Sequence, residues 1–183
     1  ENADAKLSIA RAAIPYLVPN TSIFLDAGTT VMSLVRQLPN QHYTIVTSGA
    51  NIAIELSQRS RSTVSCVGGQ ISSSTLSLSG PQAEAFLATV NIDTAVLAAT
   101  GYSAGAGFTV GSYTENSLKR HVIQKADKVI LLIDRSKLGR TLPFTFASLS
   151  DIDVVICDAP LPEDFVQAAR AAGTEVLQVQ PAK

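Results

Sequence analysis

The sequence is poor in several features that mark other classes of protein. It has no tryptophan, one methionine and two cysteines in 183 residues, and only 16% of its residues are charged. The longest apolar runs, such as Val129 to Ile133, are far shorter than the ~20 residues that a membrane-spanning helix needs. The start of the sequence has no basic segment followed by an apolar one, so no secretion signal is predicted. We therefore expect a cytoplasmic protein without a membrane partner.

Clustered basic residues are also missing. The formal net charge is −1, and basic residues occur only in short groups such as Lys119-Arg120 and the separated Arg59 and Arg61. Binding to nucleic acid draws most of its affinity from clustered lysine and arginine. The chain by itself is therefore expected to bind DNA poorly.

The cysteines and histidines form no metal-binding pattern. Cys66 and Cys157 each lie in an apolar, strand-like run, which predicts two buried, reduced thiols. His42 and His121 are isolated, and the sequence has neither a CxxC motif nor a histidine pair at ligand spacing. We predict no metal site and no cofactor.

Apolar residues, in contrast, make up 46% of the chain, which is of ordinary length for one domain. Short runs rich in valine and isoleucine alternate with segments of helical periodicity. The predicted strands are 22–25, 43–47, 63–67, 94–99, 128–133, 154–157 and 175–179. The predicted helices are 30–38, 50–58, 82–89, 114–126 and 162–172. This alternation predicts an α/β fold with a mainly parallel sheet and helices on both faces.

Three segments depart from the alternation. Residues 1–20 have a helical pattern that Pro15 interrupts. Residues 71–80, "ISSSTLSLSG", alternate leucine with serine and predict an extended segment, either an antiparallel partner or a flap. Residues 100–112 are rich in glycine and predict a mobile loop.

The residues that follow the predicted strands are small, hydroxylated or basic. In open α/β sheets, ligands bind beyond the carboxyl ends of the strands. Glycine allows a ligand close to the backbone, helix starts attract anions, and lysine adds a charge for a phosphate. These strand ends are Asp26-Ala27-Gly28-Thr29-Thr30, Thr47-Ser48-Gly49, Gly68-Gly69, Thr100-Gly101 and Asp134-Arg135-Ser136-Lys137. Together they predict a pocket for a small anion, although a single Gly-Thr-Thr is also an ordinary helix N-cap.

Charged residues near these strand ends have two interpretations each. The carboxylate of Asp26 would repel a phosphate, so Asp26 is a poor phosphate ligand. It would instead accept hydrogen bonds, either from sugar hydroxyls or from the N–H groups of its own turn. Glu115 and Lys119 are four residues apart on one face of a predicted helix. They form either an exposed pair that contributes a few tenths of a kcal/mol, or a site in which Lys119 reaches an anionic ligand. The residues themselves leave both questions open.

Motifs that span almost the whole chain carry a family resemblance. They are "IFLDAGTT" (23–30), "VTSGANIAIEL" (46–56), "VGGQI" (67–71), "SGPQAE" (79–84), "TGYSAGAGFT" (100–109), "ENSLKRHVI" (115–123), "VILLIDRSKLGR" (129–140) and "LSDIDVVICDAPLP" (149–162). In this order they resemble the C-terminal sensor domain of the DeoR family of bacterial transcriptional regulators. The D-A-G-T-T, K-R and D-x-S-K-x-G elements are together the most specific part.

The resemblance implies a fold similar to the sugar-phosphate isomerase and CoA-transferase-like group, with an effector site for a phosphorylated sugar or related metabolite. It implies a linker helix over 1–20, a sensor domain over 21–183, and an N-terminal winged helix-turn-helix, absent from this chain, through which a repressor of carbohydrate metabolism binds DNA. The site residues carried over by the resemblance are Asp26, Gly28, Thr29, Thr30, Thr47, Ser48, Gly68, Gly69, Gly101, Glu115, Lys119, Asp134, Ser136 and Lys137.

The chain also departs from the family pattern. Ser117 stands where an acidic residue is common two positions before Lys119, Ala104-Gly105-Ala106 replaces polar residues, and Pro15 is unusual in the linker. The first two departures leave the sugar unidentified and argue against enzyme activity.

An enzyme on the same fold is the alternative function. A phosphosugar isomerase or deaminase would use Glu115 to move a proton, with Lys119 as the electrophile. A dinucleotide site is disfavoured, because no G-x-G-x-x-G follows the first strand. The low content of charged residues favours a homodimer or homotetramer.

Overall fold

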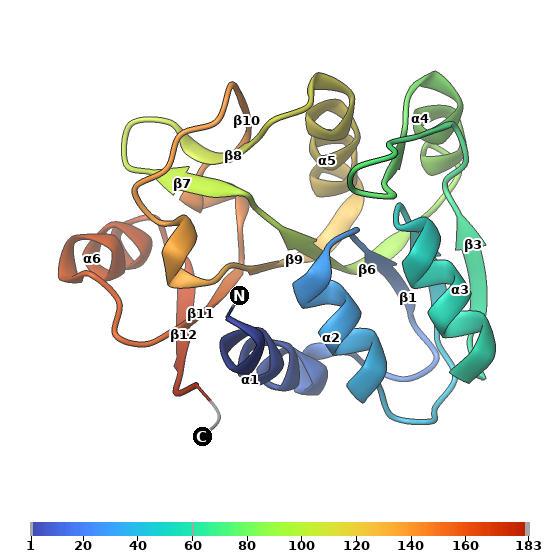
Figure 1. Cartoon of the computed structure of the whole chain (residues 1–183), viewed down its shortest axis with the longest axis horizontal. Helices are drawn as coiled ribbons and strands as arrows, with labels where there is room; N and C mark the ends of the chain where they lie inside the picture. Colours follow the sequence, from blue (N-terminus) through green and yellow to red (C-terminus); the bar gives the residue numbers. More distant parts are fainter. Residues whose placement is uncertain (1, 60, 182–183) are drawn as a thin grey trace.

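A seven-stranded parallel sheet runs through the residues that the computed structural model describes, 2–59 and 61–181 (Figure 1). Its strands are β1 (Ser22–Leu25), β2 (Thr44–Thr47), β3 (Thr63–Cys66), β6 (Ile92–Ala98), β9 (Ala126–Leu132), β11 (Val154–Asp158) and β12 (Glu175–Val179). The strand order is β12-β11-β9-β6-β1-β2-β3, and all neighbouring pairs are parallel. The predicted α/β class is confirmed, and each predicted strand agrees to within two residues at either end.

Helices cover both faces of this sheet. One face packs against α1 (Ala3–Ala13), α2 (Thr29–Gln37) and α3 (Ala50–Arg59). The other packs against α4 (Pro81–Leu87), α5 (Tyr113–Lys125) and α6 (Glu163–Ala171). The predicted helices after the first are confirmed to within two residues. No helix in the described ranges has the length and apolar character needed to cross a membrane.

The strand sequences explain why both faces are covered. In β1, Ile23 and Leu25 join the core beneath α1, α2 and α3, whereas Phe24 joins the core on the opposite face. In β9, Val129 and Ile130 divide between the two cores in the same way. Since successive side chains of a strand point to opposite faces, a continuously apolar strand has two apolar surfaces to bury.

The sheet grows in two opposite directions from the boundary between β1 and β6. The chain first moves from β1 through β2 to β3, and then returns to place β6 on the other side of β1, followed by β9, β11 and β12. α2 and α5, which follow β1 and β6, lie on opposite faces. In open α/β sheets a crevice forms beyond the carboxyl ends of the strands at such a switch point. Here the switch point lies beyond Leu25 and Ala98.

The N-terminal segment packs onto the sheet. α1 ends at Ala13 and is followed by the 3₁₀ turn η1 (Ile14–Tyr16), so the predicted interruption at Pro15 is confirmed. Ile9 and Ala10 of α1 are fully buried in the core. The division into a linker over 1–20 and a sensor domain over 21–183 stays a prediction, and its terminal residues 1, 182 and 183 lie outside the described ranges.

The serine-rich segment forms a short hairpin. β4 (Gln70–Ile71) and β5 (Leu78–Ser79) pair antiparallel with each other across a turn at residues 73–75, so the predicted extended segment is found only at the two ends of 71–80. The connecting residues 72–77, here named the strap, lie against the end of β2. Ala50 N donates to Leu76 O (2.9 Å), and Leu78 N donates to Ser48 O (2.7 Å).

The prediction of a mobile loop at 100–112 is wrong. β7 (Gly101–Ser103), β8 (Gly107–Val110) and β10 (Phe144–Ala147) form a three-stranded antiparallel sheet in the order β10-β8-β7. Tyr102 and Phe108 are buried, with ring centroids 4.8 Å apart. Gly107 has φ 77°, and a Cβ there would lie 2.4 Å from Ala147 O. Gly107 therefore permits close backbone packing within an ordered sheet.

The prediction of two buried thiols is wrong for one of them. Cys157, in β11 between β12 and β9, is buried, and burial raises the pKa of its thiol to about 12. Cys66 is exposed, because it ends β3, the edge strand of the sheet. An apolar run predicts a strand, but the position of that strand in the sheet decides its burial.

Candidate functional site

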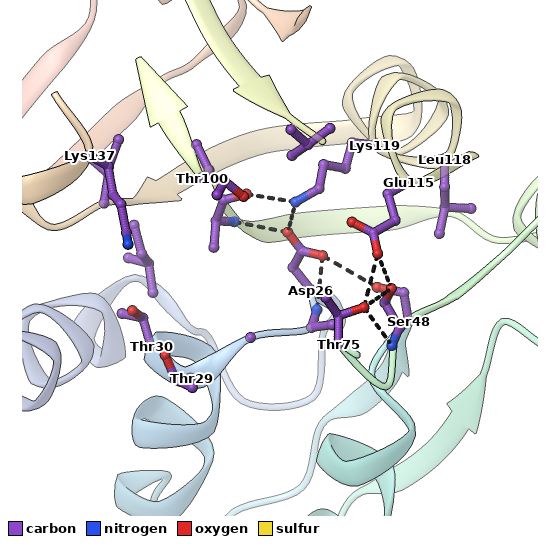
Figure 2. A pocket seen from close by; sticks show the side chains of 18 of the residues that line it. Asp26, Thr29, Thr30, Ser48, Thr75, Thr100, Glu115, Leu118, Lys119 and Lys137 are labelled. Atoms are coloured by element: carbon purple, nitrogen blue, oxygen red, sulfur yellow. Dashed lines mark hydrogen bonds and ion pairs between the residues drawn. The ribbon is translucent and has the colours of Figure 1, made fainter. Parts of the chain in front are cut away.

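A pocket of about 200 Å³ lies at the switch point, beyond the carboxyl ends of β1 and β6 (Figure 2). Its walls come from α1, the turn between β1 and α2, the strap, the end of β6, α5, and the turn η2 (Arg135–Lys137) after β9. The fold brings nine of the predicted site residues into its lining: Asp26, Gly28, Thr29, Thr30, Ser48, Glu115, Lys119, Asp134 and Lys137.

The remaining predicted site residues lie outside the lining. They are Thr47, Gly68, Gly69, Gly101 and Ser136. Thr47 is buried and donates its hydroxyl to Leu25 O (2.7 Å), so it joins β1 to β2. A Cβ on Gly101 would lie 2.5 Å from Arg140 O, so this glycine permits close packing with the chain after η2. Ser136 donates to the carboxylate of Asp134.

Some lining residues were not among those predicted. Thr75 and Ser77 of the strap and Lys6 of α1 line the pocket, together with Thr100, which the sequence analysis named only as part of a strand end. The alternating serines and leucines of 71–80 signalled an extended segment, but not which sheet edge it would cross. Lys6 had no local signal, since a lysine on an amphipathic helix usually faces solvent.

The deepest polar feature of the pocket is an ion pair between Asp26 and Lys119. Both side chains are less than 10% exposed. Lys119 Nζ donates to the Asp26 carboxylate and to Ala98 O (2.6 Å), and lies 5.0 Å from the ring centroid of Phe146. Asp26 also accepts from Ala27 N (2.8 Å) and Ala98 N (2.9 Å). The pair joins the ends of β1 and β6 to α5.

These contacts bear on the two sequence interpretations, although a role of Asp26 toward a sugar hydroxyl stays a prediction. Asp26 accepts from the N–H group of its own turn, as the structural alternative predicted. The interpretation of Glu115 and Lys119 as an exposed pair is wrong, because Lys119 is buried and bonded to Asp26. A sequence offers no sign that two residues 93 positions apart meet across a switch point.

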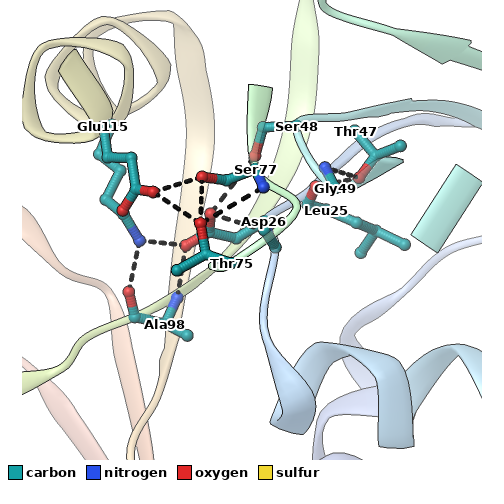
Figure 3. A network of polar contacts seen from close by, with 11 residues as sticks. Leu25, Asp26, Thr47, Ser48, Gly49, Thr75, Ser77, Ala98 and Glu115 are labelled. Carbon is teal, nitrogen blue, oxygen red and sulfur yellow. Dashed lines mark hydrogen bonds and ion pairs between the residues drawn. The ribbon is translucent and has the colours of Figure 1, made fainter. Parts of the chain in front are cut away.

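Glu115 binds the strap to the start of α5 (Figure 3). Its carboxylate accepts hydrogen bonds from Thr75 Oγ1 (3.0 Å) and from Ser77 Oγ. The two hydroxyls are themselves 2.8 Å apart. At the helix start, Glu115 N donates to the capping Ser112 Oγ (3.4 Å). These contacts place a carboxylate and two hydroxyls together on one wall of the pocket.

Asp134 forms the opposite wall, where β9 leads into η2. Its carboxylate accepts from Ser136 N (3.1 Å), from Ser136 Oγ and from Asn2 Nδ2 (3.2 Å). Burial acts to raise the pKa of Asp134, but these hydrogen bonds and the charge of Lys137 outweigh it and hold the pKa below its usual value. Asp134 is therefore ionised at neutral pH.

The N-terminus of α2 lines the pocket and has no side-chain cap. Its N-cap is Gly28, with φ 123°, a conformation that favours glycine, and no side chain caps the helix. The first N–H groups of a helix have no partner within the helix, and the helix dipole adds positive potential there. Thr29 and Thr30 carry hydroxyls at this position, and Figure 2 shows Lys137 pointing toward them. The arrangement suits an anion.

The balance of charges in the pocket points the same way. Asp26, Glu115 and Asp134 each accept hydrogen bonds from partners within the protein. Within residues 2–59 and 61–181, in contrast, the side chains of Lys6 and Lys137 make no hydrogen bond or salt bridge. No group of three potential metal-ligating side chains occurs in these ranges either. The lining therefore carries three lysines and three carboxylates, and Lys6 and Lys137 are the lysines whose N–H donors are left for a ligand in the described ranges.

Comparisons with known proteins identify close sequence relatives. Residues 1–159 match the family model described as the DeoR C terminal sensor domain. The chain is 35% identical over 178 residues to the HTH-type transcriptional regulator GlpR of Haloferax volcanii, covering 97% of this chain and 69% of that protein. It is 30% identical over 174 residues to the HTH-type transcriptional repressor GlcR of Bacillus subtilis, covering 95% and 67%. The chain thus spans about two thirds of the length of these relatives.

Solved structures are similar in fold at much lower identity. Ribose 5-phosphate isomerase A from Methanocaldococcus jannaschii has a TM-score of 0.57 and 18% identity, with 78% of this chain and 57% of that chain covered. For eIF2B beta from Chaetomium thermophilum the values are 0.58, 15%, 83% and 48%. These similarities confirm the predicted sugar-phosphate isomerase-like fold but say nothing of activity. By the family model and its sequence relatives, the chain belongs to the DeoR C-terminal sensor domain family.

Proposed function

We propose that this chain is the effector-binding domain of a DeoR-type transcriptional regulator, and that its effector is a phosphorylated sugar or a related small metabolite. The observation that carries the proposal is the pocket at the switch point. It is lined by an uncapped helix start and by Lys6 and Lys137, whose side chains make no hydrogen bond or salt bridge within the described residues. Occupancy of the pocket would regulate DNA binding by a winged helix-turn-helix domain that this chain does not include.

The phosphate group binds at the start of α2. Backbone N–H groups after Gly28 donate to its oxygens, the hydroxyls of Thr29 and Thr30 add further donors, and Lys6 and Lys137 neutralise its charge. Such a site favours a phosphate over a carboxylate, because a phosphate offers more acceptor oxygens to the several donors.

The sugar lies on the side of the pocket lined by Glu115. Ser48, Thr75 and Ser77 line this side together with the Glu115 carboxylate. Hydroxyls both donate and accept, so they match the hydroxyls of a sugar, and the carboxylate accepts from one of them. A cavity of about 200 Å³ suits a small metabolite better than a dinucleotide.

A non-enzymatic role fits the site better than the isomerase or deaminase alternative. The relatives carry the names of transcriptional regulators. Lys119, the electrophile of the alternative, is engaged by Asp26, and Glu115, its base, is engaged by the strap. We further propose a cytoplasmic homodimer or homotetramer, in which effector binding changes the spacing of the DNA-binding domains.

The test is a thermal-shift and calorimetric screen of the chain against phosphorylated sugars, each paired with its unphosphorylated form. We expect saturable stabilisation by at least one phosphorylated member and none by its partner, because a ligand stabilises the state to which it binds. The variant with Thr29 and Thr30 replaced by valine is expected to fold but to lose this stabilisation. Unchanged stabilisation in that variant would place the ligand elsewhere.

The same ligands separate a sensor from an enzyme. Each is incubated with the chain in deuterated water and followed by NMR. Replacement of a proton by solvent deuterium on the sugar carbon next to the carbonyl, at catalytic rates, would contradict the sensor proposal. Binding without exchange supports it.

A further inference from the structure

The N-terminal helix contributes directly to the pocket, although its residues are far in sequence from the other lining residues. Lys6 of α1 is half-buried and lines the pocket. One turn earlier, Asn2 Nδ2 donates to the Asp134 carboxylate (3.2 Å), which lines the same pocket. In Figure 1 the N-terminus lies beside the turn that follows β9 and the start of α2.

We propose that α1 senses the effector: Lys6 binds its phosphate group, and this contact changes the stability and position of the first turns of α1. The inference rests on the proposed function and deepens it. It assigns a ligand contact to α1. It also identifies α1 as the segment that transmits ligand binding in the pocket to regions beyond the sheet.

The two halves of α1 are held differently. Ile9, Ala10 and Ala13 are fully buried, so hydrophobic packing anchors the second half of the helix to the core. In the first turns only Ala5 is buried, and no side chain caps the helix. A helix start held by a few polar contacts opens at a lower free energy than one held by the core.

The polar contacts of this helix start depend on the pocket. Asp134 caps η2, which carries Lys137, and the same carboxylate holds Asn2. Lys6 and Lys137 both line the pocket, and the side chain of neither makes a hydrogen bond or salt bridge in the described part of the chain, although the charge of Lys137 acts on Asp134. A phosphate placed between them neutralises both lysines. Binding therefore draws the first turns of α1 toward η2 and α2.

The first experiment measures affinity, with inorganic phosphate and ribose 5-phosphate as probes. K6A is expected to weaken each probe roughly tenfold, because it removes a charge-assisted hydrogen bond. K6R keeps the charge and should retain most of the affinity. R11A is the matched control, since Arg11 lies on the same helix but bonds to Gln37 outside the pocket lining. Its affinity should equal that of the unmodified chain.

The second experiment follows amide hydrogen exchange at saturating probe. In the unmodified chain, exchange should slow at residues 6–9 of α1 and at residues 29–33 of α2. In K6A at saturation, it should slow only in α2. A merely structural role for Lys6 would change the exchange of α1 without probe, but would not remove its response to probe.

The outcomes separate the inference from the proposed function. Unchanged affinity in K6A, or equal protection of α1 in K6A and in the unmodified chain, overturns the role of Lys6 while the effector site stands. If neither these probes nor any phosphorylated sugar in the screen protects α2 in the unmodified chain, the effector site itself is refuted. The inference then fails with it.

Discussion

The two sides of the pocket are built on opposite principles. On the α5 side, Asp26 and Lys119 neutralise each other, and Glu115 is bonded to the strap. On the α2 side, the helix start has no side-chain cap, and the side chains of Lys6 and Lys137 make no hydrogen bond or salt bridge in the described part of the chain. The first side holds separate elements of the fold together. The second has hydrogen-bond donors and positive charges that the described part of the protein leaves available to a ligand.

The largest expected effect comes from breaking the α5 side. Lys119→Ala leaves the buried Asp26 carboxylate without its counter-charge, which should lower the free energy of unfolding by about 3–5 kcal/mol. Urea denaturation measures this loss. Lys125→Ala on the same helix is the control, because its side chain is only half-buried, makes no salt bridge in the described ranges and donates to Ala88 O, and it should change stability by less than ~0.5 kcal/mol.

A double variant then separates charge from packing. Asp26→Asn combined with Lys119→Met removes both charges together and should be less destabilising than Lys119→Ala alone. If the double variant is instead the less stable of the two, the hydrogen bonds that the Asp26 carboxylate accepts from Ala27 N and Ala98 N, rather than the ion pair, hold this side together.

The next largest effect is expected at Glu115. Glu115→Ala leaves the hydroxyls of Thr75 and Ser77 without their carboxylate acceptor and should cost about 2 kcal/mol. Hydrogen exchange should increase in the strap, residues 72–77, more than in β9. Uniform exchange across both segments would show that Glu115 supports the whole fold rather than the strap.

Lys137 tests the α2 side. Lys137→Ala should leave the free energy of unfolding within ~0.5 kcal/mol of the original, because the side chain has no salt bridge in the described ranges. Affinity for a phosphorylated ligand should fall roughly tenfold, whereas affinity for its unphosphorylated form should not change. Isothermal calorimetry on the matched pair measures both. An equal loss for the two ligands would mean that Lys137 does not contact phosphate.

The smallest expected effect is a pH dependence at Asp134. Because the pKa of Asp134 is lower in the folded protein than its usual value, its ionised form stabilises the fold above the unfolded-state pKa of about 3.9. That contribution disappears as the pH falls through the lower, folded-state pKa. Asp134→Asn should therefore flatten the acid side of the stability–pH curve and leave its slope near pH 7 unchanged.

Much of the fold follows from local patterns in the sequence. The apolar runs of β1 and β9 predict strands buried on both faces, and the helical periodicity between strands predicts their crossovers. The strand ends then mark the edge of the sheet at which Gly28 and Ser48 meet. Burial at an edge strand, as at Cys66, depends on strand order and is not local.

The contacts within the site could not be predicted from the sequence, for the same reason. Asp26 and Lys119 are 93 residues apart, and Asn2 and Asp134 are 132 residues apart. Glycines in β7 and β8 suggested mobility, whereas they allow backbones to pack closely. Composition shows that a glycine is present but not what lies against it.

The packing of α1 also has a practical consequence for dissecting the protein. Ile9, Ala10 and Ala13 fill the core beside α2, β9, β11 and β12. A fragment beginning after Tyr16 would expose to water the apolar surface of the sheet and of α2 that α1 covers, and is expected to aggregate. Expression of this domain therefore has to include the first helix, even when only the sheet is of interest.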